Sequence, residues 1–388
     1  MKRTIVRALL AAAVALSAAP APAQDAYVVG LTGAITGPVA ATYAAAIEGL
    51  RLYVETLNAR GGVNGKPVRL VMVDDQGEPS RSVANAKRLL TQDNVLVLVH
   101  ASPSSTYPPV VAEVKRARVP LLYAGSICPK EVYPPADEMQ FCSTAFGSFY
   151  ESEMALRFLK DSSSGTVRLG MAAMAIPLSR GEIDFAEELA KKMGIATVDK
   201  EVIPPPTPDY TPFATKLKDA GANWVYSAAP WVTQVRTFEA LRRLGWSGRY
   251  VAMGHVQSED ELPRLKDGEF YVFGANALFQ DDLPAHREIR EAATRAKTTH
   301  PVTQLTEGWV AGLVLEQALK GTPWPPTAEK TRAAMNDLRV DTKGLRGGPI
   351  EWTKDNHFRN KQYYRVWRWD PAKNAIVRVR DWTAIEIR

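Results

Sequence analysis

The feature that most constrains the fold is a repeated alternation of short apolar runs with amphipathic segments. The first apolar run covers 27–31, and after it Ile47, Leu50 and Val54 recur at helical spacing until a Gly-Gly pair. Apolar residues at this spacing form one face of a helix, and glycine is a common stop. The opening of the chain therefore predicts a buried strand followed by an amphipathic helix.

The same alternation continues to the end of the chain. Further strands are expected at 68–74, 95–99, 119–124, 167–174, 198–203, 224–228, 250–254, 271–274, 363–369 and 376–379. Further helices are expected at 79–91, 109–118, 150–160, 181–193, 211–220, 232–244 and 306–319. Apolar strands separated by helices are typical of parallel sheets covered on both faces. Because one compact sheet cannot hold so many strands, the pattern predicts an α/β chain with two doubly wound lobes.

The N-terminus has the features of a secretory signal peptide. Lys2, Arg3 and Arg7 precede an apolar run at 9–16, and small residues lead up to Ala23. The run is about half of the ~20 residues that a membrane span needs. We expect a signal peptide at 1–23, cleaved after Ala23. No cysteine follows the run, so the mature protein is expected free in the periplasm and not lipid-anchored.

Charge gives no reason to expect a nucleic-acid partner. The formal net charge of the 388 residues is +6, and the signal peptide holds three of the basic residues. The remaining basic residues are scattered, with no block of five or more, which is typical of solvated helix faces.

The two cysteines, Cys128 and Cys142, are expected to form a disulfide. They lie close together in an exported chain, and the segment between them holds three prolines. Oxidising compartments favour a disulfide, which for a loop of this length contributes roughly 3 kcal/mol. Metal binding is the alternative, but two thiolates without a nearby histidine do not complete a zinc site.

Candidate binding residues lie where the predicted strands end, because ligands of open parallel sheets bind beyond these ends. The third strand runs into a hydroxyl-rich segment before a helix, where hydroxyls and free N–H groups suit a carboxylate. One of these hydroxyls is also a possible helix cap. The fourth strand ends in small residues that let a ligand approach the backbone. The residues concerned are Ser102, Ser104, Ser105 and Thr106, then Ala124, Gly125 and Ser126.

Motifs for catalysis, metal binding or cofactor binding are missing, so an enzyme is not expected. The first strand-end turn, 33–38, departs from the dinucleotide pattern, and the glycines around Lys66 depart from a phosphate loop. The five histidines are dispersed, and only His100 and His255 follow predicted strands closely; of these, His255 is a candidate ligand-binding residue. We expect no catalytic residue, no metal and no cofactor.

Three motifs carry a specific family resemblance. The T-G-P turn at 36–38, the N-x-x-G-G-V-N-G segment at 58–65 and the D-D-Q-G-x-P run at 74–79 occur in order. Together they resemble the opening of the type I periplasmic binding proteins of the branched-chain amino-acid (Leu/Ile/Val-binding) group. The resemblance continues more weakly through SPSST at 102–106 and EGWVAGLVLEQAL at 307–319, so it covers essentially the whole mature chain.

The resemblance implies two lobes joined by three crossovers, with a small-molecule ligand in the cleft and the permease of an ABC importer as partner. The crossovers are expected near Thr144, Ala275 and Gly347. The N-terminal lobe would then comprise 24–143 and 277–346, and the C-terminal lobe 144–276 and 347–388. A monomer is expected. A sensory receptor on the same fold and a secreted enzyme are the alternatives.

Carrying the family's site over implies further ligand contacts. Tyr43 occupies the place of a cleft aromatic, and Trp231 falls near a second one. Arg180 stands where amino-acid binders have a tyrosine before a glycine. The acid that holds the ligand's ammonium group should follow His255, but Val256 occupies that place, unless Glu259 or Asp260 substitutes.

This departure favours an apolar or aromatic carboxylate over an α-amino acid. A buried ammonium group without a carboxylate partner is costly. An arginine on the second lobe can instead bind a carboxylate through a bidentate pair of hydrogen bonds. The alternatives are that Arg180 is a solvent-facing helix start, and that the ligand is a branched-chain amino acid after all.

Overall fold

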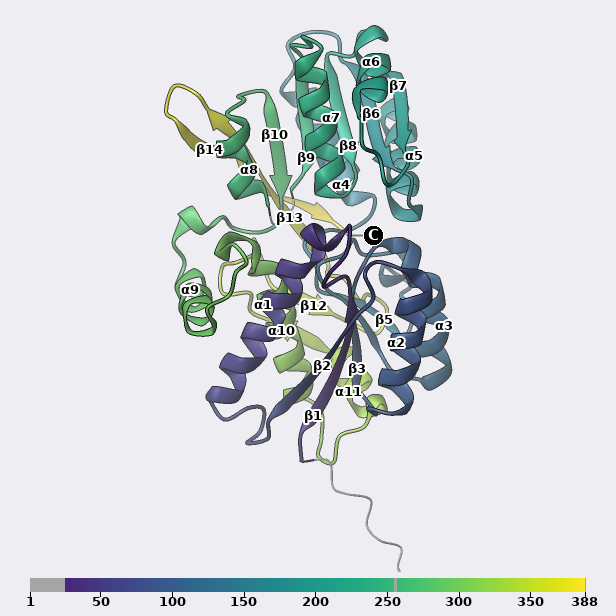
Figure 1. The fold of residues 1–388 in the computed structure, drawn as a ribbon, viewed down its shortest axis with the longest axis vertical. Coiled ribbons are helices and arrows are strands. Elements are labelled where there is room, and N and C mark those ends of the chain that lie inside the picture. Colours follow the sequence, from purple (N-terminus) through teal and green to yellow (C-terminus); the bar gives the residue numbers. More distant parts are fainter. Residues whose placement is uncertain (1–24, 255–256, 388) are drawn as a thin grey trace, which may run out of the picture.

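The computed structural model describes residues 25–254 and 257–387, which form two lobes stacked along the long axis of the molecule (Figure 1). Over these residues no helix has the length and apolar character needed to cross a bilayer. The same residues contain no group of three or more His, Cys, Asp or Glu side chains that could hold a metal ion.

The first lobe is built from two separate stretches of chain. The first stretch contains β1 (Tyr27–Gly33), α1 (Ala40–Ala59), β2 (Val68–Asp74), α2 (Pro79–Thr91), β3 (Val97–Ala101), the short 3-10 helix η1 (Ser104–Thr106), α3 (Tyr107–Ala117), β4 (Leu121–Tyr123) and β5 (Gln140–Cys142). The second stretch contains α9 (Pro284–Ala296), η4 (Val302–Gln304), α10 (Thr306–Lys320), α11 (Ala328–Met335), β11 (Leu338–Val340) and β12 (Ile350–Trp352).

The sheet of the first lobe is parallel, in the order β2-β1-β3-β4-β5. Helices α1 and α10 cover one face, and α2 and α3 cover the other (Figure 1). On the first face Trp309 of α10 packs edge-on against Tyr53 of α1, with ring centroids 5.0 Å apart. Both faces are buried, which explains why these strands read as continuous apolar runs.

The second lobe holds the middle and the end of the chain. Its elements are α4 (Tyr150–Asp161), β6 (Arg168–Met174), α5 (Pro177–Lys192), β7 (Ala196–Ile203), α6 (Thr211–Asp219), β8 (Trp224–Ala228), α7 (Trp231–Arg243), β9 (Arg249–Met253), α8 (Ser258–Leu265), β10 (Phe270–Gly274), β13 (Lys361–Asp370) and β14 (Ala375–Glu386).

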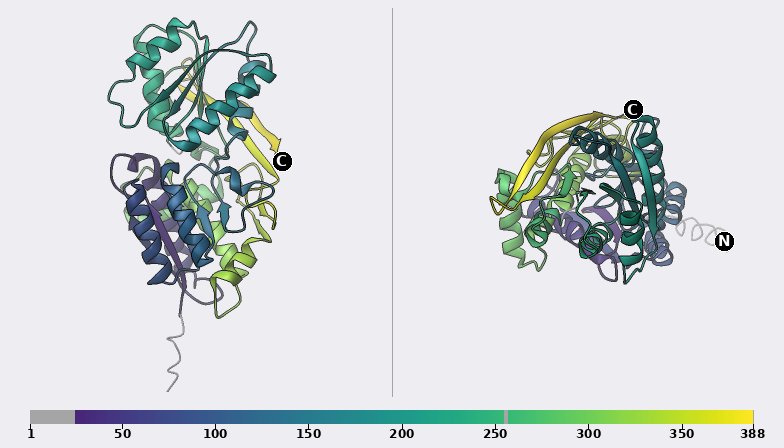
Figure 2. Two further views of the ribbon diagram at one scale, coloured as in Figure 1. Left: turned by 90° about the vertical axis from the view of Figure 1, so that its right-hand side faces the viewer. Right: turned by 90° about the horizontal axis from the view of Figure 1, so that it is seen from above.

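The sheet of the second lobe is mixed, in the order β14-β13-β10-β9-β8-β6-β7. Its central strands β6 to β10 pair in parallel, whereas β13 and β14 add an antiparallel edge. Figure 2 shows this hairpin (yellow) running along one side of the molecule from the level of the crossovers into the second lobe. The prediction of an α/β chain with two sheet-based lobes is confirmed.

The chain passes between the lobes after β5, after β10 and between β12 and β13. The expectation of a third crossover near Gly347 placed it too early. Strand β12 pairs antiparallel with β11, and its Ile350 and Trp352 lie in the core of the first lobe. The chain therefore stays in the first lobe through β12 and leaves it only after Phe358, which packs among first-lobe residues.

One buried carboxylate, Glu307 at the start of α10, joins the first two crossovers to the segment that precedes β12. It accepts hydrogen bonds from the Ala145 backbone N–H (3.2 Å), the Asn276 side chain and Arg346 Nη2 (3.2 Å). The side chains of Arg346 and Glu307 are 3% and 0% exposed, so this ion pair is fully desolvated. We call these four residues the hinge cluster.

Candidate ligand-binding site between the lobes

A narrow inner cavity lies between the two lobes, where the carboxyl ends of both sheets face each other. It is lined from the first lobe by Thr42, Tyr43, Ser104, Tyr107, Gly125, Ser126 and Ile127, and from the second by Ile176, Ser179, Glu182, Ala228, Ala229, Pro230 and Met253. Its free volume is only about 30 Å³. A solute larger than water therefore enters only if the lobes move apart, as hinged domains do.

An outer groove of about 600 Å³ adjoins the inner cavity and shares Thr42 with it. It lies between the start of α1 in the first lobe and α7 and α8 in the second. Its apolar wall includes Trp231, Val232 and Val235, and its charged residues include Arg236, Glu261 and Arg264. Both arginines are engaged with Glu239, and Arg264 also pairs with Glu261.

Hydrogen bonds across the cleft hold the lobes together. The Leu178 N–H at the start of α5 donates to Ser104 Oγ at 3.2 Å. At the rim, the Gln257 side chain donates to the Ala41 carbonyl, and Asp260 accepts from Thr303 Oγ1 at 2.9 Å. These contacts join first-lobe residues to second-lobe residues, so the arrangement is a closed one.

Of the hydroxyl-rich segment after β3, the structure brings Ser104 to the inner cavity. Ser102 is buried and donates to Asp75 at 2.7 Å. Thr106 is also buried, and its hydroxyl donates to the Pro103 carbonyl at 2.6 Å. Ser105 is half-buried and does not line the cavity. The predicted four-hydroxyl site is therefore reduced to one side chain, because the other hydroxyls face inward or away from the cavity.

Asp75 explains why Ser102 turns inward. This fully buried carboxylate accepts hydrogen bonds from Thr32, Ser82 and Ser102 and from the Gly77 N–H. A buried carboxylate requires such donors to offset its lost hydration. The second aspartate of the D-D-Q-G run thus ties three strand-end segments of the first lobe together beneath the cleft.

After β4, Gly125 and Ser126 line the inner cavity, whereas Ala124 packs in the first-lobe core. Gly125 has φ +73°, and a Cβ added there would lie 2.8 Å from the Ala46 Cβ, so only glycine fits comfortably. Ser126 Oγ donates to the Ser102 carbonyl and accepts from the Ser102 N–H, both at 3.1 Å. These bonds fix the two strand-end loops against each other.

The residues carried over from the family are divided between the two spaces. Tyr43 lines the inner cavity, and Trp231 lines the outer groove instead. Arg180 is exposed and lines neither, because its neighbours Ser179 and Glu182 occupy the cleft side of α5. The prediction that Arg180 faces the cleft does not hold in this arrangement. His255 lies outside the described residues.

The most important residue missed from the sequence is Glu182, a buried carboxylate in the wall of the inner cavity. Starting this helix at Pro177 would have placed Ser179 and Glu182, which are three residues apart, on one face of α5, whereas the expected start at 181 left Ser179 outside the helix. Glu259 and Asp260 were the possible substitutes for the family's acid, but they line neither the inner cavity nor the outer groove. Glu259 accepts hydrogen bonds from the Phe279 and Gln280 N–H groups, and Asp260 lies at the rim of the cleft.

His100 is a structural residue below the cleft. It is buried at the end of β3, and its Nε2 lies 2.9 Å from Thr106 Oγ1. Burial lowers the pKa of His100 to about 4, although the charge of Asp75 acts in the opposite direction. The imidazole is therefore neutral at physiological pH.

Acidification should consequently destabilise the protein through His100. Its pKa is lower in the folded chain than the ordinary 6.5, so the stability it contributes is present above pH 6.5 and is lost as the pH falls toward 4. We expect a loss of about 2 kcal/mol between pH 7.5 and pH 5 from this group. Urea unfolding of the wild type and of His100→Gln at several pH values tests this. Parallel pH curves for both proteins would contradict it, and His300→Gln serves as the control.

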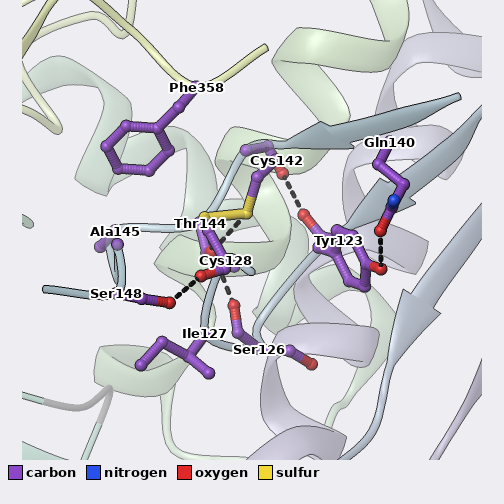
Figure 3. The surroundings of a disulfide bond; sticks show 12 residues. Tyr123, Ser126, Ile127, Cys128, Gln140, Cys142, Thr144, Ala145, Ser148 and Phe358 are labelled. Atoms are coloured by element: carbon purple, nitrogen blue, oxygen red, sulfur yellow. Dashed lines mark hydrogen bonds between the residues drawn. A yellow bond between two sulfur atoms is a disulfide. The ribbon is translucent and has the colours of Figure 1, made fainter. Parts of the chain in front are cut away.

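The predicted disulfide between Cys128 and Cys142 is confirmed, with a Cα–Cα distance of 5.8 Å. Figure 3 shows it next to Ser126 and Ile127, two residues that line the inner cavity. Thr144, in the first crossover, donates to the Ser126 carbonyl at 2.7 Å, and Ser148 donates to the Cys128 carbonyl. The disulfide therefore secures the cleft-lining segment 125–127 to the start of the first crossover.

Two doubly wound lobes, three crossovers and a cavity between the lobes define a two-lobed solute-binding protein. The chain belongs to the periplasmic binding protein family, whose model matches residues 26–374. Its relatives support the Leu/Ile/Val-binding group within that family. An amino acid binding protein of Pseudomonas aeruginosa is 26% identical over 374 residues, covering 88% of this chain and 90% of the relative.

Solved structures share the fold at low sequence identity. A branched-chain amino acid ABC transporter protein from Thermus thermophilus with bound valine has a TM-score of 0.81 at 18% identity, covering 93% of this chain and 97% of that one. A solute-binding protein from R. palustris in complex with 4-hydroxybenzoate has a TM-score of 0.77 at 16% identity, covering 94% and 98%. The same fold thus accommodates an amino acid in one protein and an aromatic acid in another.

Proposed function

We propose that this protein is the periplasmic substrate-binding component of an ABC importer, and that it delivers a small carboxylate-bearing solute to a membrane permease. The observation that carries the proposal is the inner cavity, which both lobes line at the carboxyl ends of their sheets. The bond between Ser104 and Leu178 closes the lobes over this cavity. Such closure around a ligand is the ordinary motion of two-lobed receptors.

The lining favours an acid with an apolar body. From the first lobe, Ser104 offers a hydroxyl to a carboxylate, and Gly125 and Ser126 offer backbone groups. Ile127, Ile176 and Met253 supply apolar surface, and Tyr43 and Tyr107 supply aromatic surface. Aromatic faces contribute large contact areas with specific geometry. An aromatic or apolar acid is therefore the leading ligand class, and the R. palustris complex with 4-hydroxybenzoate supports it.

A branched-chain amino-acid receptor is the second candidate. Glu182 favours it, because a carboxylate in the cavity wall can accept a hydrogen bond from a ligand's ammonium group. The P. aeruginosa amino acid binding protein and the T. thermophilus complex with valine point the same way.

Binding of the right solute should raise the thermal stability of the purified mature protein. A ligand that binds only the native state adds about 2.7 kcal/mol at a concentration of 100 times its Kd. A thermal-shift panel should contain aromatic acids, unbranched and branched apolar acids, and leucine, isoleucine and valine. We expect at least one non-amino carboxylic acid to raise the melting temperature. A panel in which no carboxylate has any effect would contradict the proposal.

Two variants locate the carboxylate. Ser104→Ala removes a hydroxyl that lines the cavity and should weaken the identified acid, whereas Arg180→Ala changes an exposed residue of the same cleft region and should leave its affinity unchanged. Calorimetric titration compares the two. A strong effect of Arg180→Ala with none of Ser104→Ala would place the carboxylate on the second lobe.

A further inference from the structure

Glu182 is held rigidly in the wall of the inner cavity. It projects from the first turns of α5 and is 1% exposed. Its carboxylate accepts hydrogen bonds from the Ser152 N–H (3.1 Å), from Ser152 Oγ (2.5 Å) and from the Phe149 N–H. These donors belong to the start of α4, so the orientation of the carboxylate is fixed before any ligand arrives.

Of the described residues that line the inner cavity with Glu182, none is a lysine, an arginine or a histidine. Ser152 and Tyr226, which are hydrogen-bonded to each other at 3.2 Å, lie behind Glu182 and are uncharged. The nearby Glu151 is a second buried carboxylate, which accepts from the Gly147 N–H and from the Tyr364 hydroxyl. Among the described residues, therefore, the cavity wall presents an acid without a compensating cation.

The three hydrogen bonds of Glu182 do not exhaust its capacity. A carboxylate has about four acceptor positions, and here three are filled. Burial raises the pKa of Glu182 to about 6, although the hydrogen bonds from Ser152 and Phe149 act in the opposite direction. A further donor that enters the cavity would meet an acceptor that is already oriented and poorly solvated, where charged hydrogen bonds are strongest.

We infer that Glu182 is a specificity-determining residue, which selects carboxylate-bearing solutes that also carry an N–H or O–H donor directed at the second lobe. The inference rests on the proposed function, because it places the solute in the inner cavity. The carboxylate of the solute would lie near Ser104, Gly125 and Ser126, and its donor would reach Glu182. An ammonium group and a hydroxyl share this chemistry, and the experiment separates them.

The test uses ligand pairs that differ only in the donor. The pairs are phenylalanine with 3-phenylpropanoate, leucine with 4-methylpentanoate, and 4-hydroxybenzoate with benzoate. Calorimetric titration of the wild type should show that the donor-bearing member of at least one pair binds about 10-fold to 100-fold more tightly, the range of a charged hydrogen bond. A preference in the first two pairs identifies an ammonium group, and a preference in the third identifies a hydroxyl.

The variant Glu182→Gln should remove that preference while the donor-free member keeps its affinity or gains some. Glu188→Gln, an exposed change on the same helix, is the matched control and should alter neither. If Glu182→Gln does not fold, the wild-type comparison alone decides. Equal binding within every pair would overturn this inference and leave the proposed function standing. Absence of binding by every carboxylate would overturn both.

Discussion

Replacing Arg346 by alanine is expected to lower the free energy of unfolding by about 3–5 kcal/mol, because it leaves a buried carboxylate without its charged partner. Glu307 is fully buried beside the first two crossovers, and Arg346 is the cation that pairs with it. The Ala145 N–H and the Asn276 side chain remain as donors, but neither carries a charge. Urea unfolding followed by far-UV circular dichroism measures the loss.

Two further variants make this prediction specific. Arg339→Ala removes a surface arginine that is 76% exposed and pairs with Glu351, so it should change stability by less than about 1 kcal/mol. The double change Glu307→Gln with Arg346→Met removes both charges and should recover much of the loss, since the cost lies in the unpaired charge. If Arg346→Ala and Arg339→Ala behaved alike, the hinge cluster would not be a source of stability.

Replacing both cysteines by alanine should lower the free energy of unfolding by about 3 kcal/mol, because the unfolded chain regains the freedom of the closed loop. The loop spans a separation of 14 residues, and both cysteines are fully buried. We also expect weaker solute binding, because the bond supports the cleft wall through Ser126 and Thr144.

The wild type after reduction is the control for this change. Reduction opens the loop but keeps both sulfur atoms, so it separates the effect of the covalent link from that of the altered packing. Chemical denaturation should give similar stabilities for the reduced wild type and the double variant, both below the oxidised protein. Equal stability of the oxidised and reduced proteins would contradict the prediction.

Most of the long strands and helices could be predicted from the sequence. Both faces of each sheet are buried, and this burial sets the spacing of apolar residues in the strands and in the helices that cover them. The strand at Val68–Asp74 and the helix at Pro79–Thr91 match the expected bounds. Helix α5 begins at Pro177 and not at 181, because a proline at the first helical position was not used as a start signal. The strands β5, β11 and β12 were missed, since three residues are too few to show a period.

Residues of the candidate site could be predicted only where their place at the end of a parallel strand is enough to put them at the cleft. The ends of β3 and β4 had to face the cleft in a parallel sheet, and Ser104, Gly125 and Ser126 do line the inner cavity there. Ser102 was misjudged because its partner Asp75 belongs to a different strand end, and such pairing becomes visible only in three dimensions. Arg180 was singled out by alignment with the family and Glu182 was not considered, whereas the rotation of α5 decides which of them faces the cavity.

The packing of α10 against α1 has a consequence for the order in which the molecule can be assembled. Gly308 of α10 approaches the backbone of Ala46 so closely that a Cβ there would overlap the Ala46 carbonyl oxygen. More than half of the chain separates these two helices, so one face of the first sheet stays only partly covered, by α1, until α10 has been synthesised. The second sheet likewise waits for β13 and β14 at the end of the chain. Such distant contacts make folding slow, and neither lobe can be completed before nearly the whole polypeptide exists.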